Sequence, residues 1–417
     1  MRFVVIGASA AGINAIRKLR ELNPNSEITL ISKDKDIYSR CILYHHLKGI
    51  RDLKKLSFVE VNFIEKNRVE WIKGKEVIGL DTVSQKVKLD NGEEVDYDKL
   101  LIASGAHSFI PKIMGIEGVK NIVGFRNFED VEEIEKLLPH VKDIVIMGGG
   151  LVGIDVAAGL LHKNKNLYLV EMGDRMLPIQ LDKHSATVYE KAFEKEGLKQ
   201  YYSNGIALVG SENGVVKRVV LKNGKILPCD LLISAAGIRS NIEFLKESDV
   251  SCDNNGLLFD EKGETNIPNI YGAGDVSGRA PIWPVAVKEG IIAAYNMSGI
   301  EKSMDDFFAS KATMNFLGIP TMSLGITSGY DESYIEEIDL DNLGNYKKII
   351  HKDGVIHGAI LQGDLSYAGI LTQLIRLKID VSKVKKRLFD IDYSDFFHTT
   401  ENFEFTYDFE FTYDEVK

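Results

Sequence analysis

A glycine pattern near the middle of the chain restricts the possible fold more than any other feature. Residues 144–147 are apolar and mostly β-branched, Gly148, Gly150 and Gly153 follow with the spacing G-x-G-x-x-G, and residues 154–161 have the composition of a helix. The first glycine of such a motif permits a tight turn, the second lets the backbone approach a pyrophosphate, and the third lets the helix pack closely on the strand. The pattern therefore predicts a dinucleotide-binding strand, turn and helix, whose N-terminus faces the phosphates.

Two further strands extend this unit. Residues 167–170 form a predicted strand that ends in Glu171, at the distance where a carboxylate binds a ribose 2′-hydroxyl. A later strand at residues 231–236 closes the unit and runs into Gly237. The residues predicted to contact the nucleotide here are Gly148, Gly150, Leu151, Val152, Gly153, Glu171 and Gly237.

A second unit of the same kind opens the chain. A β-branched strand at residues 2–6 runs into Gly7, Ser9 and Gly12, and an amphipathic helix over residues 13–22 follows. Serine stands at the middle glycine position, where its small side chain keeps most of the backbone approach. The next strand, residues 27–31, is followed by Ser32 and not by a carboxylate, so Ser32 or Asp34 is expected to hold the ribose. Two such units predict an α/β fold that binds two dinucleotides face to face.

Length and composition limit the remaining possibilities. A chain of 417 residues is too long for one ordinary core, so two or three domains are expected. The formal net charge of −10 argues against a nucleic-acid partner, and no apolar stretch is long enough to span a membrane. No signal peptide precedes the first strand, and three widely separated cysteines favour a reducing cytoplasm. No metal site is predicted.

Two later segments complete a recognisable set of motifs. A strand from residue 99 ends in Ala103, Ser104 and Gly105, and residues 265–276 form a strand that ends in Gly274 and Asp275. With the two glycine turns, these motifs resemble the pyridine nucleotide–disulfide oxidoreductase superfamily over about the first 300 residues, closest to its NADH:rubredoxin reductase and nitrite reductase flavoprotein types.

The resemblance implies FAD on the first unit and NAD(H) on the second. It also implies that Asp275 hydrogen-bonds the ribityl or phosphate region of the flavin; a helix-capping aspartate is the alternative. The residues expected to bind FAD are Gly7, Ser9, Ala10, Gly12, Ser32, Arg40, Ala103, Ser104, Gly105, Gly274 and Asp275.

The domain boundaries follow from these motifs. Residues 1–112 and 239–303 are expected to form a discontinuous FAD-binding domain, and residues 113–238 the inserted NAD(H)-binding domain, each with three layers. Residues 304–390 resemble the small α+β interface domain of the family, which covers the flavin and often mediates dimerisation, so a monomer or homodimer is expected. It should contain a hairpin of residues 346–351 and 355–361 and a helix over residues 368–377.

The last residues form an acidic aromatic tail, 391–417. The hexapeptide at residues 403–408, Phe-Glu-Phe-Thr-Tyr-Asp, is repeated at residues 409–414. Strict alternation predicts an extended strand with one aromatic face. An edge strand or hairpin on the protein's own sheet is expected, and a strand that docks a partner is the alternative.

The segment after the second strand decides the chemistry. Tyr38 and Arg40 match the Tyr-x-Arg of rubredoxin and nitrite reductase flavoproteins, whereas Cys41 falls at the single cysteine of peroxide- and coenzyme-A-disulfide-reducing relatives. The glycine and proline that follow in those relatives are Ile42 and Tyr44 here. Cys41 is therefore either redox-active or a small buried cysteine. Arg40 would favour a thiolate, but alternation along an extended chain points it away from Cys41.

Two further residues are candidates for the catalytic site. His45 is expected near the flavin edge or as an ordinary histidine. Asp155 takes the position where relatives carry a glutamate near the flavin–nicotinamide junction; an acid that favours the helix dipole is the alternative. Paired-cysteine reductases are excluded, because no second cysteine lies near Cys41.

The sequence thus predicts an NADH-dependent FAD oxidoreductase of the cytoplasm. The first hypothesis for its acceptor is a redox protein such as rubredoxin, ferredoxin or a partner oxidoreductase. A small acceptor reduced at Cys41, such as peroxide, oxygen or a thiol compound, is the second. An NADH-binding redox sensor that turns over slowly is the third.

Overall fold

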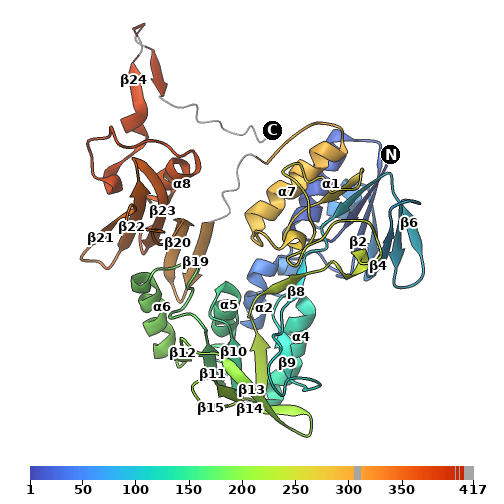
Figure 1. Ribbon diagram of the computed structural model, residues 1–417, viewed down its shortest axis with the longest axis horizontal. Coiled ribbons are helices and arrows are strands. Elements are labelled where there is room, and N and C mark those ends of the chain that lie inside the picture. The colour runs from blue at the N-terminus through green and yellow to red at the C-terminus, as the bar shows by residue number, and fades with distance from the viewer. Residues whose placement is uncertain (305–310, 400, 403, 408–417) are drawn as a thin grey trace. The chain divides into compact units, whose positions relative to one another are not determined.

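The computed structural model describes residues 1–304, 311–399, 401–402 and 404–407. The chain divides into two compact units (Figure 1). The nucleotide unit consists of Met1–Leu177 and Glu190–Ala309, and the C-terminal unit of Pro178–Tyr189 and Ser310–Lys417. Each unit is described by itself below.

The nucleotide unit begins with a five-stranded parallel sheet. Its order is β18-β7-β1-β2-β3. Alternation along β1 sends Phe3 and Val5 to one face and Val4 and Ile6 to the other. The strands are β1 (Arg2–Ile6), β2 (Glu27–Ser32), β3 (Val69–Lys73), β7 (Lys99–Ile102) and β18 (Ile270–Gly272).

The two faces of this sheet are covered differently. Helices α1 (Ala10–Leu22) and α7 (Trp283–Met297) pack together over the face of Phe3 and Val5, where Figure 1 shows them side by side. The antiparallel sheet β4 (Val77–Asp81), β5 (Lys86–Leu89) and β6 (Glu94–Asp96) contributes Leu80, Val87 and Leu89 to the core on the other face. The expected three-layer dinucleotide domain is therefore present.

A second domain repeats this plan. Its parallel sheet has the order β12-β11-β10-β16-β9, and Val145 and Met147 of β10 pack on an antiparallel sheet of three strands. Helices α4 (Phe128–Leu137) and α5 (Leu151–Leu160) belong to it, and the fold-class prediction is confirmed. The strands are β9 (Ile122–Gly124), β10 (Asp143–Met147), β11 (Asn166–Val170), β12 (Lys199–Tyr201) and β16 (Leu231–Ser234), with β13 (Ile206–Glu212), β14 (Val215–Leu221) and β15 (Ile226–Pro228) in the second sheet.

The chain crosses between the two domains on a pair of short strands. β8 (Ala106–Ser108) and β17 (Ile238–Ser240) pair antiparallel. Two short helices, α2 (Leu43–Leu47) and α3 (Phe63–Lys66), lie between β2 and β3 in the sequence. Helix α1 begins at Ala10, three residues earlier than expected, because Ser9 already has the extended backbone of an N-cap.

The C-terminal unit contains a five-stranded antiparallel sheet. Its order is β19-β20-β23-β22-β21, and α8 (Ala368–Arg376) packs on β23 and β20. The expected hairpin and helix are confirmed. The segment before α6 (Lys183–Lys195) is tied to the sheet, because Tyr346 donates a 2.5 Å hydrogen bond to Asp182. The strands are β19 (Lys311–Phe316), β20 (Ile319–Gly325), β21 (Ile335–Leu340), β22 (Tyr346–Lys352) and β23 (Val355–Gln362).

The aromatic tail differs from its expectation. β24 (Phe397–Thr399) pairs antiparallel with β25 (Phe405–Tyr407), which is part of the first hexapeptide. Within the described part of the chain this two-stranded ribbon joins no strand of the five-stranded sheet, so the expected addition to that sheet is wrong there. The second hexapeptide, residues 409–414, lies outside the described residues.

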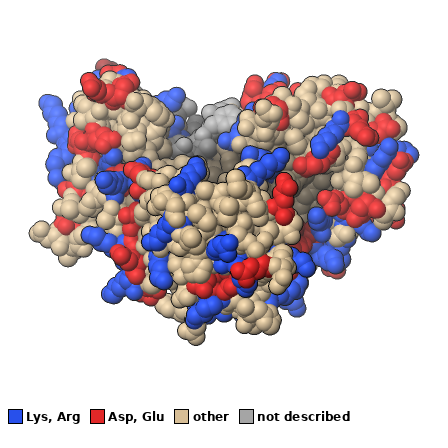
Figure 2. Space-filling model, turned by 60° about the horizontal axis from the view of Figure 1, so that its bottom comes forward, with Lys and Arg blue, Asp and Glu red and all other residues tan. Residues whose placement is uncertain are grey.

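Two surface properties bear on the expectations. Basic and acidic side chains are interspersed over the face shown in Figure 2, so the formal charge of −10 is not gathered into one acidic area of that face. Among the residues that the structure describes, none of the helices is both long enough and apolar enough to cross a lipid bilayer.

Candidate functional site: two dinucleotide turns and the segment between them

The two glycine turns have the same backbone geometry. Gly7 and Gly148 both have φ = 111°, a conformation that side chains rarely adopt. A methyl group on Gly7 would lie 2.1 Å from the carbonyl oxygen of Ala103, and one on Gly148 would lie 2.4 Å from that of Ala235. Each first glycine is therefore required by a backbone carbonyl at the end of the neighbouring strand.

The third glycine of each turn meets a similar restriction. A methyl group on Gly12 would lie 2.0 Å from the Gly7 carbonyl oxygen, and one on Gly153 would lie 1.9 Å from the Gly148 carbonyl oxygen. These glycines allow helices α1 and α5 to begin directly against their turns. The first helical residues, Ala10 and Leu151, follow at once.

The middle position is where the turns differ. Ser9 and Gly150 are both extended N-caps, with φ of −115° and −76°, and neither backbone requires glycine. A methyl group on Gly150 would meet no atom of the described residues within 4 Å. The first turn therefore accepts a serine, and both helix N-termini present their N–H groups as a pyrophosphate requires.

The ends of the second strands also differ. Glu171, which follows β11, accepts backbone hydrogen bonds from Gly149 and Gly173, each at 2.5 Å, so its carboxylate lies against the glycine turn. Ser32, at the end of β2, is only 3% exposed. Its hydroxyl donates to the Asp34 carbonyl at 2.7 Å and accepts from the Trp71 indole at 2.8 Å. The Ser32 hydroxyl is thus already hydrogen-bonded within the protein.

The residues after β2 form a buried polar cluster. The Asp34 carboxylate accepts hydrogen bonds from the Tyr38 hydroxyl at 2.8 Å and the Arg40 guanidinium at 2.6 Å. Arg40 also donates to the Asn127 side chain at 3.2 Å, while its remaining Nη1 is buried without a hydrogen-bond partner among the described residues. Burial raises the pKa of Tyr38, which remains a phenol.

Arg126 is a site residue that the sequence did not reveal. It follows β9, and its guanidinium donates to the carboxylate of Asp275, 149 residues further along the chain. Its Nε is buried and has no partner among the described residues. Asp275 is the first residue of a 3₁₀ turn that follows Gly274. Its carboxylate is bound by the Arg126 guanidinium and not by a backbone N–H group of a helix. The capping alternative for Asp275 is therefore not observed.

Cys41 lies on a 3₁₀ turn, Arg40–Ile42, and as a residue it is exposed. The alternative of a small buried cysteine is therefore wrong. Protein around the sulfur still excludes part of the water, and this desolvation raises the pKa of the thiol. The nearby Asp155 raises the thiol pKa further, while Arg126 opposes the shift. Arg40 is held by Asp34, so the adjacent cation does not activate the thiol.

Asp155 and His45 are the two other residues predicted for the catalytic site. Asp155 belongs to the first turns of α5, and burial raises the pKa of its carboxyl well above the usual range. A carboxylate placed to favour the helix dipole would have a lowered pKa, so that alternative is disfavoured. Burial lowers the pKa of His45, and Arg51 and Lys48 lower it further. The His45 ring packs edge-on against Tyr44, with its Nδ1 buried and unpartnered among the described residues.

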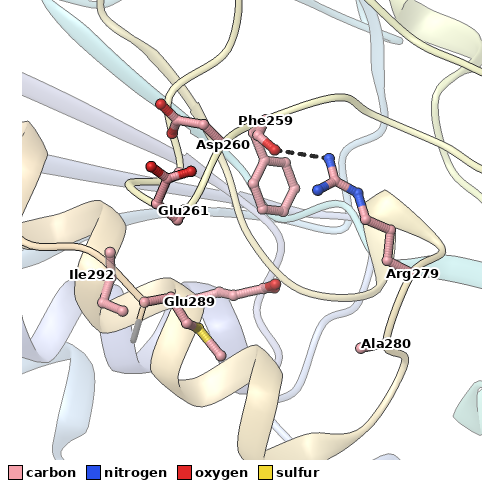
Figure 3. Close-up of a pocket in the computed structure, with 9 residues that line it drawn as sticks. Phe259, Asp260, Glu261, Arg279, Ala280, Glu289 and Ile292 are labelled. Carbon is pink, nitrogen blue, oxygen red and sulfur yellow. Dashed lines mark hydrogen bonds between the residues drawn. The ribbon is translucent and has the colours of Figure 1, made fainter. Parts of the chain in front are cut away.

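A cavity of about 280 Å³ lies beside the Gly274 turn (Figure 3). Glu289 of α7 extends into it and accepts a 2.7 Å hydrogen bond from the Gly274 backbone N–H. Burial is the main cause that raises the pKa of Glu289, to about 7. Arg279, on the other side of the cavity, donates to the carbonyl of Phe259 at 2.8 Å, the dashed line in Figure 3. Glu289, too, was absent from the predicted site.

Ser104 and Gly105, which follow β7, are hydrogen-bonded to Asn241, the residue after β17. Ser104 donates to the Asn241 carbonyl at 2.8 Å, and the Asn241 backbone N–H donates to the Gly105 carbonyl at 2.9 Å. Gly237, at the matching strand end of the second domain, has φ = 114° and accepts from the backbone N–H of Phe109. These residues therefore hold the strand ends that surround the two turns.

Comparison with known proteins decides the family. Residues 1–290 match the family described as pyridine nucleotide-disulphide oxidoreductase, and residues 311–379 match the rubredoxin NAD+ reductase C-terminal domain. The chain belongs to the pyridine nucleotide-disulphide oxidoreductase family. It is accordingly an NADH-dependent flavoprotein oxidoreductase with FAD and NAD(H) as cofactors, as predicted.

Individual relatives differ in how much of their length is shared. The chain is 32% identical to an NADH oxidase of Methanocaldococcus jannaschii, over 72% of this chain and 71% of that protein. It is 27% identical to the assimilatory nitrate reductase electron transfer subunit of Bacillus subtilis, over 94% of this chain but only 51% of that protein. The structure of an NAD-dependent persulfide reductase from A. fulgidus has the same fold, with a TM-score of 0.81 and 24% identity over 91% of this chain and 77% of that one.

The geometry of the first domain fits FAD. The Gly7 turn has the shape that a pyrophosphate requires, and Arg40 and Arg126 each have a buried N–H group that no described residue of the protein satisfies. Buried donors of this kind are costly unless a ligand, water or ion completes them. The first turn, Arg40, Arg126 and Asp275 would hold the FAD, and the second turn with Glu171 would hold the NADH.

Proposed function

We propose that this enzyme passes a hydride from NADH to FAD and then gives the electrons to a redox protein such as rubredoxin, ferredoxin or a partner oxidoreductase. The observation that carries the proposal is the environment of Cys41. A redox thiol must be partly thiolate, but desolvation and Asp155 raise the pKa of Cys41. The match of residues 311–379 to a rubredoxin reductase C-terminal domain supports the same acceptor class.

A thiol that stores electrons also needs a second partner. Cycling through sulfenic acid or a mixed disulfide is usually completed by a resolving cysteine. Cys229 is buried in the core of the second domain, where burial raises the pKa of its thiol to about 12. Cys252 is exposed and pairs in a β-bridge with Leu257, far from Cys41 in the sequence. Neither cysteine is a candidate to resolve Cys41.

The residues of the chain have distinct duties in this reaction. When bound, FAD accepts the hydride and divides its two electrons as the acceptor requires. The two glycine turns and helices α1 and α5 bind the pyrophosphates, and Glu171 orients the ribose of NADH. Burial raises the pKa of the Asp155 carboxyl well above its usual range, and we assign this residue to the junction of the flavin and the nicotinamide.

We assign the domains as their motifs suggest. Residues 1–112 and 239–303 bind FAD, residues 113–238 bind NAD(H), and residues 304–390 form the interface domain of a monomer or homodimer, followed by the tail at residues 391–417. The match of residues 311–379 to a separate C-terminal domain supports the third boundary.

A second candidate function is reduction of a small acceptor at Cys41. Two observations favour it: Cys41 is exposed, and Arg126 lowers the pKa of its thiol against the other influences. A 32% identical relative is an NADH oxidase. Substrates of this class would be oxygen, peroxide or a thiol compound.

Anaerobic reductive titration separates the two candidates. Oxidised wild-type enzyme should consume one two-electron equivalent per FAD, and Cys41→Ser should retain most NADH:dye turnover. Cys252→Ser is the matched control, since Cys252 is also exposed and is far from Cys41 in the sequence. A reproducible second equivalent that disappears in Cys41→Ser, together with loss of peroxide or disulfide reduction, would establish the second function in place of the first.

A further inference from the structure

The cavity beside the Gly274 turn contains two opposite charges that do not pair with each other. Its described lining residues all belong to the nucleotide unit. Glu289 extends into the cavity from α7, and Arg279 extends towards Phe259 from the loop before that helix (Figure 3). Arg279 lowers the pKa of Glu289, so the two groups are near each other, but within the described residues no ion pair joins them. The cavity therefore keeps a cation and an anion apart.

The Glu289 carboxyl has one oxygen left for a ligand. Its Oε2 accepts the Gly274 N–H at 2.7 Å, whereas its Oε1 makes no hydrogen bond to any residue that the structure describes. Burial is the main cause that raises the pKa of this carboxyl, and the Gly274 N–H and Arg279 oppose the shift only in part. A cation in contact with the carboxylate would stabilise its ionised form. The ammonium group of a ligand would be such a cation.

The Arg279 guanidinium has donors to spare. The residue is exposed, and among the described residues its side chain makes one hydrogen bond, to the Phe259 carbonyl at 2.8 Å. The nearby Asp253 carboxylate already accepts the backbone N–H groups of Asn255 and Gly256. A guanidinium carries five N–H donors in a planar fork that matches a carboxylate. A ligand carboxylate is therefore the group that Arg279 is suited to bind.

The rest of the cavity favours a small ligand that is partly apolar. Phe259, Ile292 and Met304 line it, and of these Phe259 and Met304 are buried. The volume of about 280 Å³ is near the lower end of the range for ligand pockets, about 300–1,000 Å³. Asp260 and Glu261 also line the cavity and are exposed, and their negative charge disfavours a ligand that is only an anion.

We propose that this cavity binds a small zwitterion of the α-amino acid class. The ammonium group of the ligand binds Glu289, and its carboxylate binds Arg279. Its apolar side chain lies against Phe259, Ile292 and Met304. Such a molecule carries both charges on one carbon atom, which suits two protein charges that are close but unpaired. None of the described lining residues belongs to either glycine turn, so this site is additional to those for FAD and NADH and does not depend on the electron acceptor.

Isothermal titration calorimetry of the full-length protein with FAD bound tests the site. The probes are L-leucine and L-methionine, and two analogues of leucine each lack one charge: 4-methylpentanoic acid lacks the ammonium group, and leucine amide lacks the carboxylate. At least one of the two amino acids should bind with a Kd of about 1 mM or lower. Each leucine analogue should bind at least about tenfold more weakly than leucine, because it leaves Glu289 or Arg279 without its partner.

Two variants locate the binding. Glu289→Gln keeps an oxygen that can accept the Gly274 N–H but removes the anion, and Arg279→Gln removes the guanidinium fork. Each should weaken amino-acid binding at least about tenfold. Glu247→Gln and Arg218→Gln are the matched controls, since both residues are exposed and neither lines the cavity, and both variants should bind as the wild type does. The comparison of leucine with its analogues uses only the wild type, so it decides the matter if a cavity variant does not fold.

The pH dependence of binding gives an independent readout. Glu289 must be ionised to bind an ammonium group, and its pKa is about 7, so the affinity of the wild type should rise about tenfold from pH 6 to pH 8. The other charged groups near it are Asp260 and Glu261 in the cavity lining, with Asp275 and Arg279, which act on its pKa. Glu289→Gln retains all four and should lose the pH dependence.

Three outcomes would overturn the proposal. The first is that neither amino acid binds at concentrations up to about 10 mM. The second is that leucine amide or 4-methylpentanoic acid binds as tightly as leucine, which would indicate a site for an amine or for a carboxylic acid. The third is that Glu289→Gln and Arg279→Gln both bind the amino acid with wild-type affinity. None of these measurements involves electron transfer, so failure here is distinct from failure of the proposed acceptor.

Discussion

The two dinucleotide turns of this enzyme share a backbone but differ in their side chains. Gly7 and Gly148 have the same φ, and the third glycines, Gly12 and Gly153, would each collide with the carbonyl of the first glycine if they carried a methyl group. At the end of the second strand the units diverge, since Glu171 binds its turn while Ser32 is buried and bound to Trp71. We therefore expect the backbone to provide phosphate binding and the strand ends to determine which nucleotide each turn accepts.

The largest effect is expected at Gly148, where the backbone conformation and the neighbouring carbonyl exclude a side chain. Gly148→Ala should lower the free energy of unfolding by about 2–5 kcal/mol, because φ = 111° strains an alanine and its methyl group would lie 2.4 Å from the Ala235 carbonyl. Gly150→Ala is the matched variant, whose methyl group meets no atom within 4 Å in the part of the chain that the structure describes. It should keep the wild-type unfolding curve and bind NADH at least tenfold more weakly. Equal unfolding curves for both variants would contradict this reading of the turn.

The next effect concerns Glu289, the carboxyl group in the cavity beside the Gly274 turn. Because the pKa of Glu289 is raised to about 7 in the folded protein, the folded state binds its proton more tightly than the unfolded state. The stability contribution of this carboxyl is therefore present below about pH 4.5 and is lost as the pH rises through 7. Glu289→Gln, which is neutral throughout, should match the wild type at pH 5 and exceed its free energy of unfolding by about 2 kcal/mol at pH 8.

Urea denaturation at the two pH values measures this difference. Glu247→Gln is the control, since Glu247 is exposed and does not line the cavity. A Glu289→Gln protein that is less stable than the wild type at pH 8 would mean that the ionised Glu289, hydrogen-bonded to the Gly274 N–H, stabilises the turn.

The strand ends should affect nucleotide choice by a smaller amount. Wild-type enzyme should prefer NADH, because a 2′-phosphate would meet the charge of Glu171. Glu171→Ala should reduce the ratio of kcat/KM for NADH to that for NADPH by about tenfold. Ser32→Ala, at the matching position of the first unit, should cost about 1 kcal/mol of stability through the Trp71 hydrogen bond and leave that ratio unchanged. A wild type that prefers NADPH would contradict the role of Glu171.

The smallest effect is expected for Ser9, at the middle position of the first turn. Ser9 has an extended backbone and its side chain makes no capping hydrogen bond to α1. Ser9→Gly should therefore change FAD affinity by less than about threefold and lower the free energy of unfolding by roughly 0.5 kcal/mol through chain entropy. Fluorescence titration of the apoprotein measures the first quantity. A loss of FAD affinity above tenfold would show that the serine hydroxyl itself binds the phosphate.

Most of the fold was predictable because its signals are local. The strand, turn and helix around Gly7 and Gly148 are each contained within some 30 residues, and strand alternation gives the core faces. Arg126 and Glu289 were not predictable, because their roles depend on contacts that are distant or made by the backbone. Arg126 binds Asp275, 149 residues further along the chain, and Glu289 accepts a hydrogen bond from the backbone of Gly274. The exposure of Cys41 was missed because a 3₁₀ turn replaces the expected extended chain.

The contact between Gly159 and Leu47 has a consequence for engineering. A methyl group on Gly159, in the NADH helix α5, would lie 3.1 Å from the side chain of Leu47, in the short helix α2 that carries His45. Helix α5 thus packs against the segment that carries His45 as well as following the Gly148 turn. A chimera that imports residues 113–238 from another reductase, to change its coenzyme, would need a small residue at position 159. Where the donor carries a larger one, shortening Leu47 in the same chimera should relieve the contact.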